Sequence, residues 1–97
     1  MKYEVVIKEE AYYDLQDAYD YYEEQQNGLG ERFLKNIQQR LSYLAKYPLH
    51  FNKIEKEFRQ VLVDKFPYLI IYEIQERQVI VYAFFHGSQN PEKKFKT

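Results

Sequence analysis

Four residues of this sequence are of types that could transfer a proton or contact a phosphate: His86, Arg59, Lys53 and Lys56. A reaction at a phosphate needs a base, an acid for the leaving oxygen, and cations that stabilise the charge developing on the phosphate. Histidine is the side-chain type that changes charge near neutral pH. His86, which follows an apolar run, is therefore the candidate acid or base, and Arg59 and the two lysines are the candidate phosphate contacts.

Each of these candidates also has a purely structural interpretation. His86 suits a hydrogen-bonded residue at the end of a strand, and Arg59 suits a structural ion pair. Lysines on a surface usually contact water alone. Tyrosines such as Tyr19 and Tyr72 could stack on bases, yet they stand at positions that also suit the core. Both interpretations remain open on the sequence.

The sequence lacks the residue patterns of several other chemistries. It has no cysteine, so it offers neither a disulfide nor a thiolate nucleophile. It contains no Walker loop, no glycine-rich dinucleotide motif, no His-Glu-x-x-His and no zinc-ligand spacing. We therefore expect no cofactor and no metal.

Length and charge limit the class of protein further. Ninety-seven residues predict one domain, residues 1–97. The net charge of −1 is low for a protein that binds nucleic acid, because phosphate binding is driven by a basic surface. No run reaches the roughly 18–20 apolar residues of a membrane span, and the first residues do not resemble a signal peptide. We expect a cytoplasmic protein.

The apolar residues recur with two different periods, which predict strands and helices in turn. Two amphipathic helices with a short connection must pack antiparallel as a hairpin. The first helix should end at Asn27–Gly28 and the second before Pro48. The predicted strands are 2–8, 59–65, 68–74 and 78–85, the predicted helices are 9–26 and about 31–47, and 49–57 should be a loop leading into a short strand.

This order, β-α-α-β-β-β, indicates an α+β fold in which the helical hairpin packs on one face of a small, mostly antiparallel sheet. Val61 and Val63 should point to one side of their strand and Leu62 to the other. The residues expected in the core are Leu15, Ile37, Leu41, Val61, Ile70 and Val81.

Three segments of the chain resemble the RelE/ParE superfamily of toxins. Residues 11–22 together with 28–34 resemble its helical hairpin, and Phe66-Pro67-Tyr68-Leu69-Ile70-Ile71-Tyr72 resembles its third strand. Residues 79–85, followed by His86-Gly87-Ser88-Gln89-Asn90-Pro91, resemble its terminal strand and the segment after it. The three segments occur in the family's order and spacing, and the likeness extends from about residue 3 to residue 91.

The resemblance implies the toxin of a type II toxin–antitoxin system, held inactive by a cognate antitoxin protein. It also implies one of two activities. ParE-like members inhibit DNA gyrase by binding, whereas RelE-like members enter the ribosome and cut messenger RNA. Arg59 matches an arginine common across the superfamily, which could contact either a phosphate or an antitoxin carboxylate.

Two sequence positions favour the ParE-like branch. The RelE-like branch typically has an arginine in its third strand, where this chain has Leu69, and the terminal strand, residues 81–85, also contains no arginine. Loss of one such donor commonly slows a reaction about 10²–10³-fold. We therefore rank gyrase inhibition first, ribosome-dependent messenger RNA cleavage second, and an interaction module that has lost toxicity third. We accordingly favour a protein that is not an enzyme; if it is one, the resemblance implies a metal-independent endoribonuclease.

Overall fold

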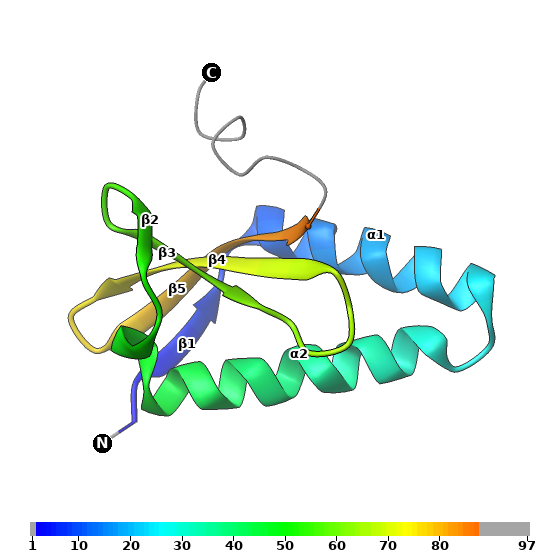
Figure 1. Ribbon diagram of the computed structural model, residues 1–97, viewed down its shortest axis with the longest axis horizontal. Coiled ribbons are helices and arrows are strands. Elements are labelled where there is room, and N and C mark those ends of the chain that lie inside the picture. Colours follow the sequence, from blue (N-terminus) through cyan, green and yellow to red (C-terminus); the bar gives the residue numbers. More distant parts are fainter. Residues whose placement is uncertain (1, 88–97) are drawn as a thin grey trace.

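A computed structural model describes residues 2–87 as two helices packed on one face of a five-stranded sheet (Figure 1). Strand order in the sheet is β1-β5-β4-β3-β2, with β1 parallel to β5 and every other pair antiparallel. This confirms the α+β fold and the hairpin on one face. The segment Ser88-Gln89-Asn90-Pro91, part of the family resemblance, lies outside the described residues.

The elements lie close to their predicted positions. The short strand expected within residues 49–57 is present as β2, so the sheet has one strand more than the predicted order names. In chain order the elements are β1 (Glu4–Ile7), α1 (Glu9–Gln25), α2 (Leu29–Lys46), the 3₁₀ turn η1 (Pro48–His50), β2 (Lys53–Glu55), β3 (Phe58–Leu62), β4 (Tyr68–Gln75) and β5 (Gln78–His86).

The connection between the helices depends on a left-handed glycine. Helix α1 ends at Gln25, and Gly28, with φ of 88°, precedes the first residue of α2. Glycine adopts this conformation without steric cost. Helix α1 has no side-chain cap, but Glu9 and Glu10 lie in its first turn, where negative charge interacts favourably with the helix dipole. Among residues 2–87 no helix is long and apolar enough to cross a membrane.

The main core lies between the helices and the sheet. Ala18 and Tyr22 of α1 and Phe33 and Ile37 of α2 pack there against the inner side chains of the strands. The Phe33 ring contacts Tyr22 at 5.1 Å between centroids, and Phe66 and Tyr68 each contact both rings. These aromatic contacts bind the hairpin to the sheet.

Four of the six expected core residues are buried: Ile37, Val61, Ile70 and Val81. Leu15 and Leu41 are only partly buried and pack against this core from its margin, so the prediction that they belong to the core is confirmed only in part. Both lie beside the buried stripe of their helix rather than at its centre. The alternation in β3 is confirmed, since Val61 and Val63 are buried and Leu62 is 57% exposed.

A second, smaller cluster covers the outer face of the sheet, away from the helices. Ile71, Ala83 and Phe85 are buried there, with Ile54, Phe58 and Leu69 packed against them. Leu69 pairs with Phe85 and Ile71 with Ala83 across β4 and β5, and the register shifts by one residue between Ile71 and Tyr72. Tyr82, on this bulge, contacts Phe58 at 5.0 Å and donates a hydrogen bond to Glu73.

Candidate functional site

His86 lies at the end of β5, where it pairs with Tyr68 of β4. The two rings meet edge to face with centroids 5.3 Å apart, and the histidine is half-buried. Two residues earlier in β5, the backbone N–H of Phe84 donates to Asp14 Oδ2 of α1 at 3.2 Å. Burial raises the pKa of Tyr68, and Tyr21, Asp14 and Asp17 raise it further. Among the described residues, Asp14 and Asp17 therefore act on the Tyr68 ring that His86 contacts.

Arg59 lies on β3, opposite Tyr72. Its Nη1 donates to the carbonyl oxygen of Phe51 at 2.5 Å, which ties the strand to the segment that follows η1. Among residues 2–87 Arg59 has no ion pair, so the ion pair expected for it is replaced by a bond to a carbonyl. Tyr72 is fully buried and donates to the carbonyl of Pro48 at 2.6 Å. Burial raises the Tyr72 pKa to about 12, although Arg59 lowers it in part.

Lys53 and Lys56 lie at the β2–β3 hairpin, close to Arg59. Lys53 pairs with Arg59 in the sheet, and its Nζ lies 3.1 Å from Glu57 Oε1 in an ion pair whose side chains are 47% and 69% exposed. Lys56 forms the turn, with φ of 52°. The structure thus brings Arg59 and the two lysines together at one edge of the sheet.

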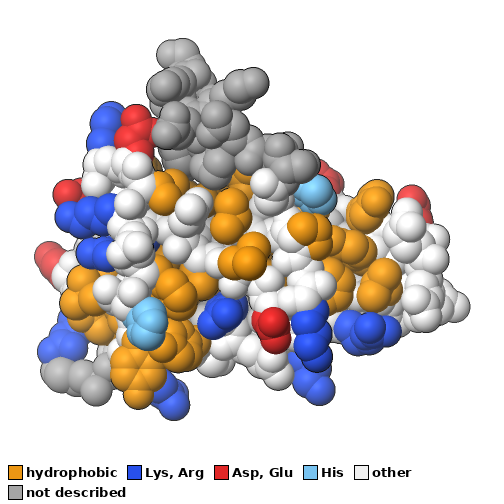
Figure 2. All heavy atoms as spheres, in the orientation of Figure 1, with side chains coloured by type: hydrophobic (Ala, Val, Ile, Leu, Met, Phe, Trp, Pro, Cys, Tyr) orange, Lys and Arg blue, Asp and Glu red, His pale blue; other side chains and the backbone are white. Residues whose placement is uncertain are grey.

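His86 does not join this cationic group. Arg59 pairs with Tyr72 and His86 pairs with Tyr68, and these two tyrosines are four residues apart along β4. At about 3.3 Å per residue and about 4.8 Å per strand, the backbones of Arg59 and His86 lie roughly 16 Å apart. Figure 2 shows hydrophobic side chains over much of the visible face of the molecule. A proton donor and a phosphate contact must act within a few ångströms of one reacting group, so these candidates do not form one catalytic centre.

Of the positions at which the sequence lacks arginine, Leu69, Ala83 and Phe85 lie on the outer face of the sheet. Leu69 packs there beside its partner Phe85, within the apolar cluster that includes Ile71 and Ala83. A phosphate placed on this part of the sheet would contact the hydrocarbon of these side chains. Among residues 2–87 no three His, Asp or Glu side chains gather closely enough to hold a metal ion.

Two further features of the structure were not predicted from the sequence. One carboxylate oxygen of Glu55, Oε2, is buried without a hydrogen-bond partner among the described residues. The other is a groove between the helices, lined by α1 residues such as Tyr12 and Leu15 and by Leu34 of α2. The spacing of Tyr12, Leu15 and Tyr19 forms a second stripe along α1, and this was the available signal for the groove.

Comparisons with known proteins agree with this description. The family model for the ParE toxin of the type II toxin–antitoxin system parDE matches residues 5–91. A solved chain of the "Chromosomal ParDE TA system from P. aeruginosa" has the same fold, with a TM-score of 0.77 over 88% of this chain and 96% of that chain, at 11% identity. No curated protein matches the sequence.

Proposed function

Because this chain belongs to the ParE toxin family of type II toxin–antitoxin systems, we propose that it acts by binding DNA gyrase and inhibiting it. A cognate antitoxin protein neutralises it, and both act in the cytoplasm. The protein performs no chemistry in this role. Its surface must therefore bind a target and an antitoxin, and it needs no catalytic centre.

The observation that carries the choice of target is the apolar outer face of the sheet. Leu69, Ala83 and Phe85 lie where the nuclease branch would need cations to hold the scissile phosphate. Absence of one stabilising donor commonly slows a reaction about 10²–10³-fold. An apolar face of this kind suits contact with protein rather than with the phosphates of RNA, because contact with phosphate requires charge-assisted hydrogen bonds.

The separation of the polar candidates supports the same choice. Arg59 is already bound to the carbonyl of Phe51, whereas His86 contacts the ring of Tyr68. The backbones of Arg59 and His86 lie roughly 16 Å apart. Neither residue can assist the other in one proton-transfer step. Arg59 is better explained as the residue that fixes the segment after η1 against the sheet.

Two measurements test the proposal, one with purified protein and one after induced expression. Purified protein should inhibit supercoiling by DNA gyrase in vitro, and transcript 5′ ends mapped after induction should show no new cuts at codon-defined positions. His86→Ala and Arg59→Ala are the diagnostic variants. Codon-positioned cuts that disappear in these variants would favour the ribosome-dependent nuclease instead. An antitoxin from the neighbouring gene should restore growth on co-expression.

A result that is negative for both targets has its own meaning. If the folded protein neither inhibits gyrase nor cuts transcripts, and its expression leaves growth unchanged, the chain is an interaction module that keeps the fold without the toxicity. Co-purification of an antitoxin would then still be expected. Such a complex should bury more than about 1,000 Å², the area typical of a stable interface.

A further inference from the structure

The two helices of the hairpin carry opposite charge. Helix α1 has seven carboxylates and neither lysine nor arginine. Helix α2 has one carboxylate, Glu31, and four cations: Arg32, Lys35, Arg40 and Lys46. The net charge of −1 is therefore the sum of an acidic helix and a basic one. A polyanion that α1 repels would be attracted to α2.

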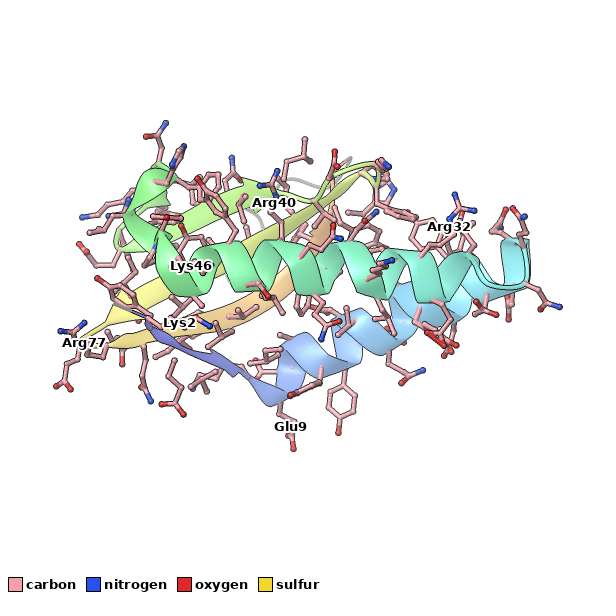
Figure 3. The ribbon with its side chains drawn as sticks, turned by 90° about the horizontal axis from the view of Figure 1, so that it is seen from below. Lys2, Glu9, Arg32, Arg40, Lys46 and Arg77 are labelled. Carbon is pink, nitrogen blue, oxygen red and sulfur yellow. The ribbon has the colours of Figure 1, made fainter. Side chains whose placement is uncertain are left out.

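The cations of α2 form a track along its length. Arg32, Lys35 and Lys46 are exposed, and Arg40 is half-buried. Arg32 and Arg40 lie on the side of the helix away from α1 (Figure 3). In Figure 2, Lys and Arg side chains gather along the lower edge of the molecule, where α2 runs in Figure 1. At 1.5 Å per residue, the track is about 21 Å long, which is room for several nucleotides of an extended strand.

An aromatic cluster that includes one of these cations lies at the C-terminal end of α2. Arg40 lies over the rings of Tyr43 and Phe51, with its guanidinium carbon 6.0 and 5.9 Å from their centroids. Tyr43 also contacts Tyr47 at 5.1 Å and His50 at 5.7 Å between centroids. The Tyr43 hydroxyl shares a hydrogen bond of 3.0 Å with His50 Nδ1. These contacts fix the rings against one another before a ligand binds.

Two hollows lie beside this cluster. The larger, of about 360 Å³, is lined by Lys46 and by Tyr47, which is 56% exposed. The smaller, of about 180 Å³, is lined by Arg40 and Tyr43. Of the described residues that line the two hollows, Asp64 alone carries a carboxylate. Each hollow therefore combines an aromatic ring with a cation.

We propose that this face of α2 binds single-stranded nucleic acid. The phosphates lie along the cations of the helix, and bases lie against Tyr47 and His50 at its C-terminal end. Proteins that bind single strands without sequence preference combine a basic track with rings on which bases stack. The carbonyl end of a helix repels phosphate, so this end suits bases better than phosphates.

An acidic protein segment is the alternative ligand for a basic helix. It would contact the cations, but its carboxylates would gain nothing from the exposed ring faces beside them. The combination of both features favours the nucleic acid. The inference goes beyond the proposed function and does not depend on the cellular target, because the contact with gyrase was assigned to the outer face of the sheet.

Fluorescence anisotropy with the full chain tests this inference. The probes are labelled oligothymidine and oligouridine strands of about 12 nucleotides. They distinguish DNA from RNA, and tight binding of either supports the proposal. The controls are an abasic strand of the same length, which keeps the phosphates, and a polyglutamate peptide of equal charge. A strand with bases should bind at least tenfold more tightly than either control, and less tightly as salt is raised.

One pair of variants tests the stacking of bases. Tyr47→Ser should weaken binding about tenfold. Tyr12→Ser, at an equally exposed tyrosine of α1, should leave it unchanged. Circular dichroism checks that each variant is folded.

A second pair of variants tests the phosphate contacts. Arg32→Gln with Lys35→Gln should make the logarithmic salt dependence of binding shallower by about one unit. Lys8→Gln with Lys56→Gln is the same change in net charge, next to Tyr82 and at the β2–β3 turn, and should not. Equal binding of either control ligand, no binding of either strand, or equal effects within either pair of variants would overturn the proposal.

Discussion

Replacement of Gly30 by alanine tests how closely the two helices must approach. Gly30 is the second residue of α2 and is buried beneath α1. A Cβ at this position would lie 2.7 Å from Glu23 Cγ and 2.9 Å from two ring carbons of Tyr19. Carbon atoms do not pack at such distances, so the helices or these side chains would have to move.

Two opposing effects set the size of the change. Alanine gains up to about 0.8–1 kcal/mol over glycine in a helix interior, although less at a second helical position. Overpacking costs about 1–3 kcal/mol. Glu23 cannot move freely, since its carboxylate accepts the two hydrogen bonds from Gly28 and Gly30, and loss of a hydrogen bond to a charged group costs about 1.5–3 kcal/mol. We expect Gly30→Ala to lower the free energy of unfolding by about 1–3 kcal/mol.

Urea unfolding followed by circular dichroism measures this difference directly. Gly28→Ala is the matched control, because nothing lies within 4 Å of a Cβ there and only its φ of 88° is unfavourable. It should cost about 1 kcal/mol, and Gly28→Asn should cost less. Glu23→Ala removes the closest contact, so the double variant with Gly30→Ala should lose less stability than the sum of the single variants. A Gly30→Ala protein as stable as the wild type would refute this reasoning.

Three other expected outcomes concern stability. Burial raises the Tyr72 pKa to about 12, so its ionisation leaves stability unchanged below about pH 10 and lowers stability as the pH rises from about 10 to about 12. Because the Tyr72 hydroxyl donates to the carbonyl of Pro48, Tyr72→Phe should be less stable than wild type by about 1–3 kcal/mol at pH 7, and urea titrations should show this difference vanish or reverse near pH 12. Ile37→Ala, at a buried site, should cost about 2–5 kcal/mol in urea unfolding, and Leu41→Ala, only partly buried, clearly less; equal losses would contradict the observed burial. Lys53→Ala, which breaks the exposed pair with Glu57, should change thermal stability by less than about 1 kcal/mol.

The sequence predicted the elements well because their signals are local. The change from alternation to a 3.6-residue period, Gly28 between the helices and Pro48 after the second are features of neighbouring residues. Their boundaries were right to within a few residues. The burial of Leu15 and Leu41 was overestimated because the period of apolar residues defines a broad stripe on each helix. Only packing decides which residues of that stripe face the centre of the core.

The candidate site could be predicted only as a set of residue types. The sequence shows directly that Leu69 and residues 81–85 provide no cation, and this absence already disfavoured a nuclease. The positions of the remaining polar residues in space could not be predicted from the sequence. The separation of His86 from Arg59 depends on the order β5-β4-β3 and on the register of each pair, which are set by contacts between residues distant in the chain.

The sequence by itself therefore determined the fold class, the family and the missing phosphate contacts, since each depends on residue types at short spacing. Only the tertiary structure decided what Arg59 and Tyr72 bind, namely the backbone carbonyls of Phe51 and Pro48. It alone decided that Tyr12, Leu15 and Leu34 share one groove beside the carboxylates of α1. The physical reason is that a side chain's neighbours are fixed by how helices and strands pack, and one sequence pattern is compatible with many such neighbours.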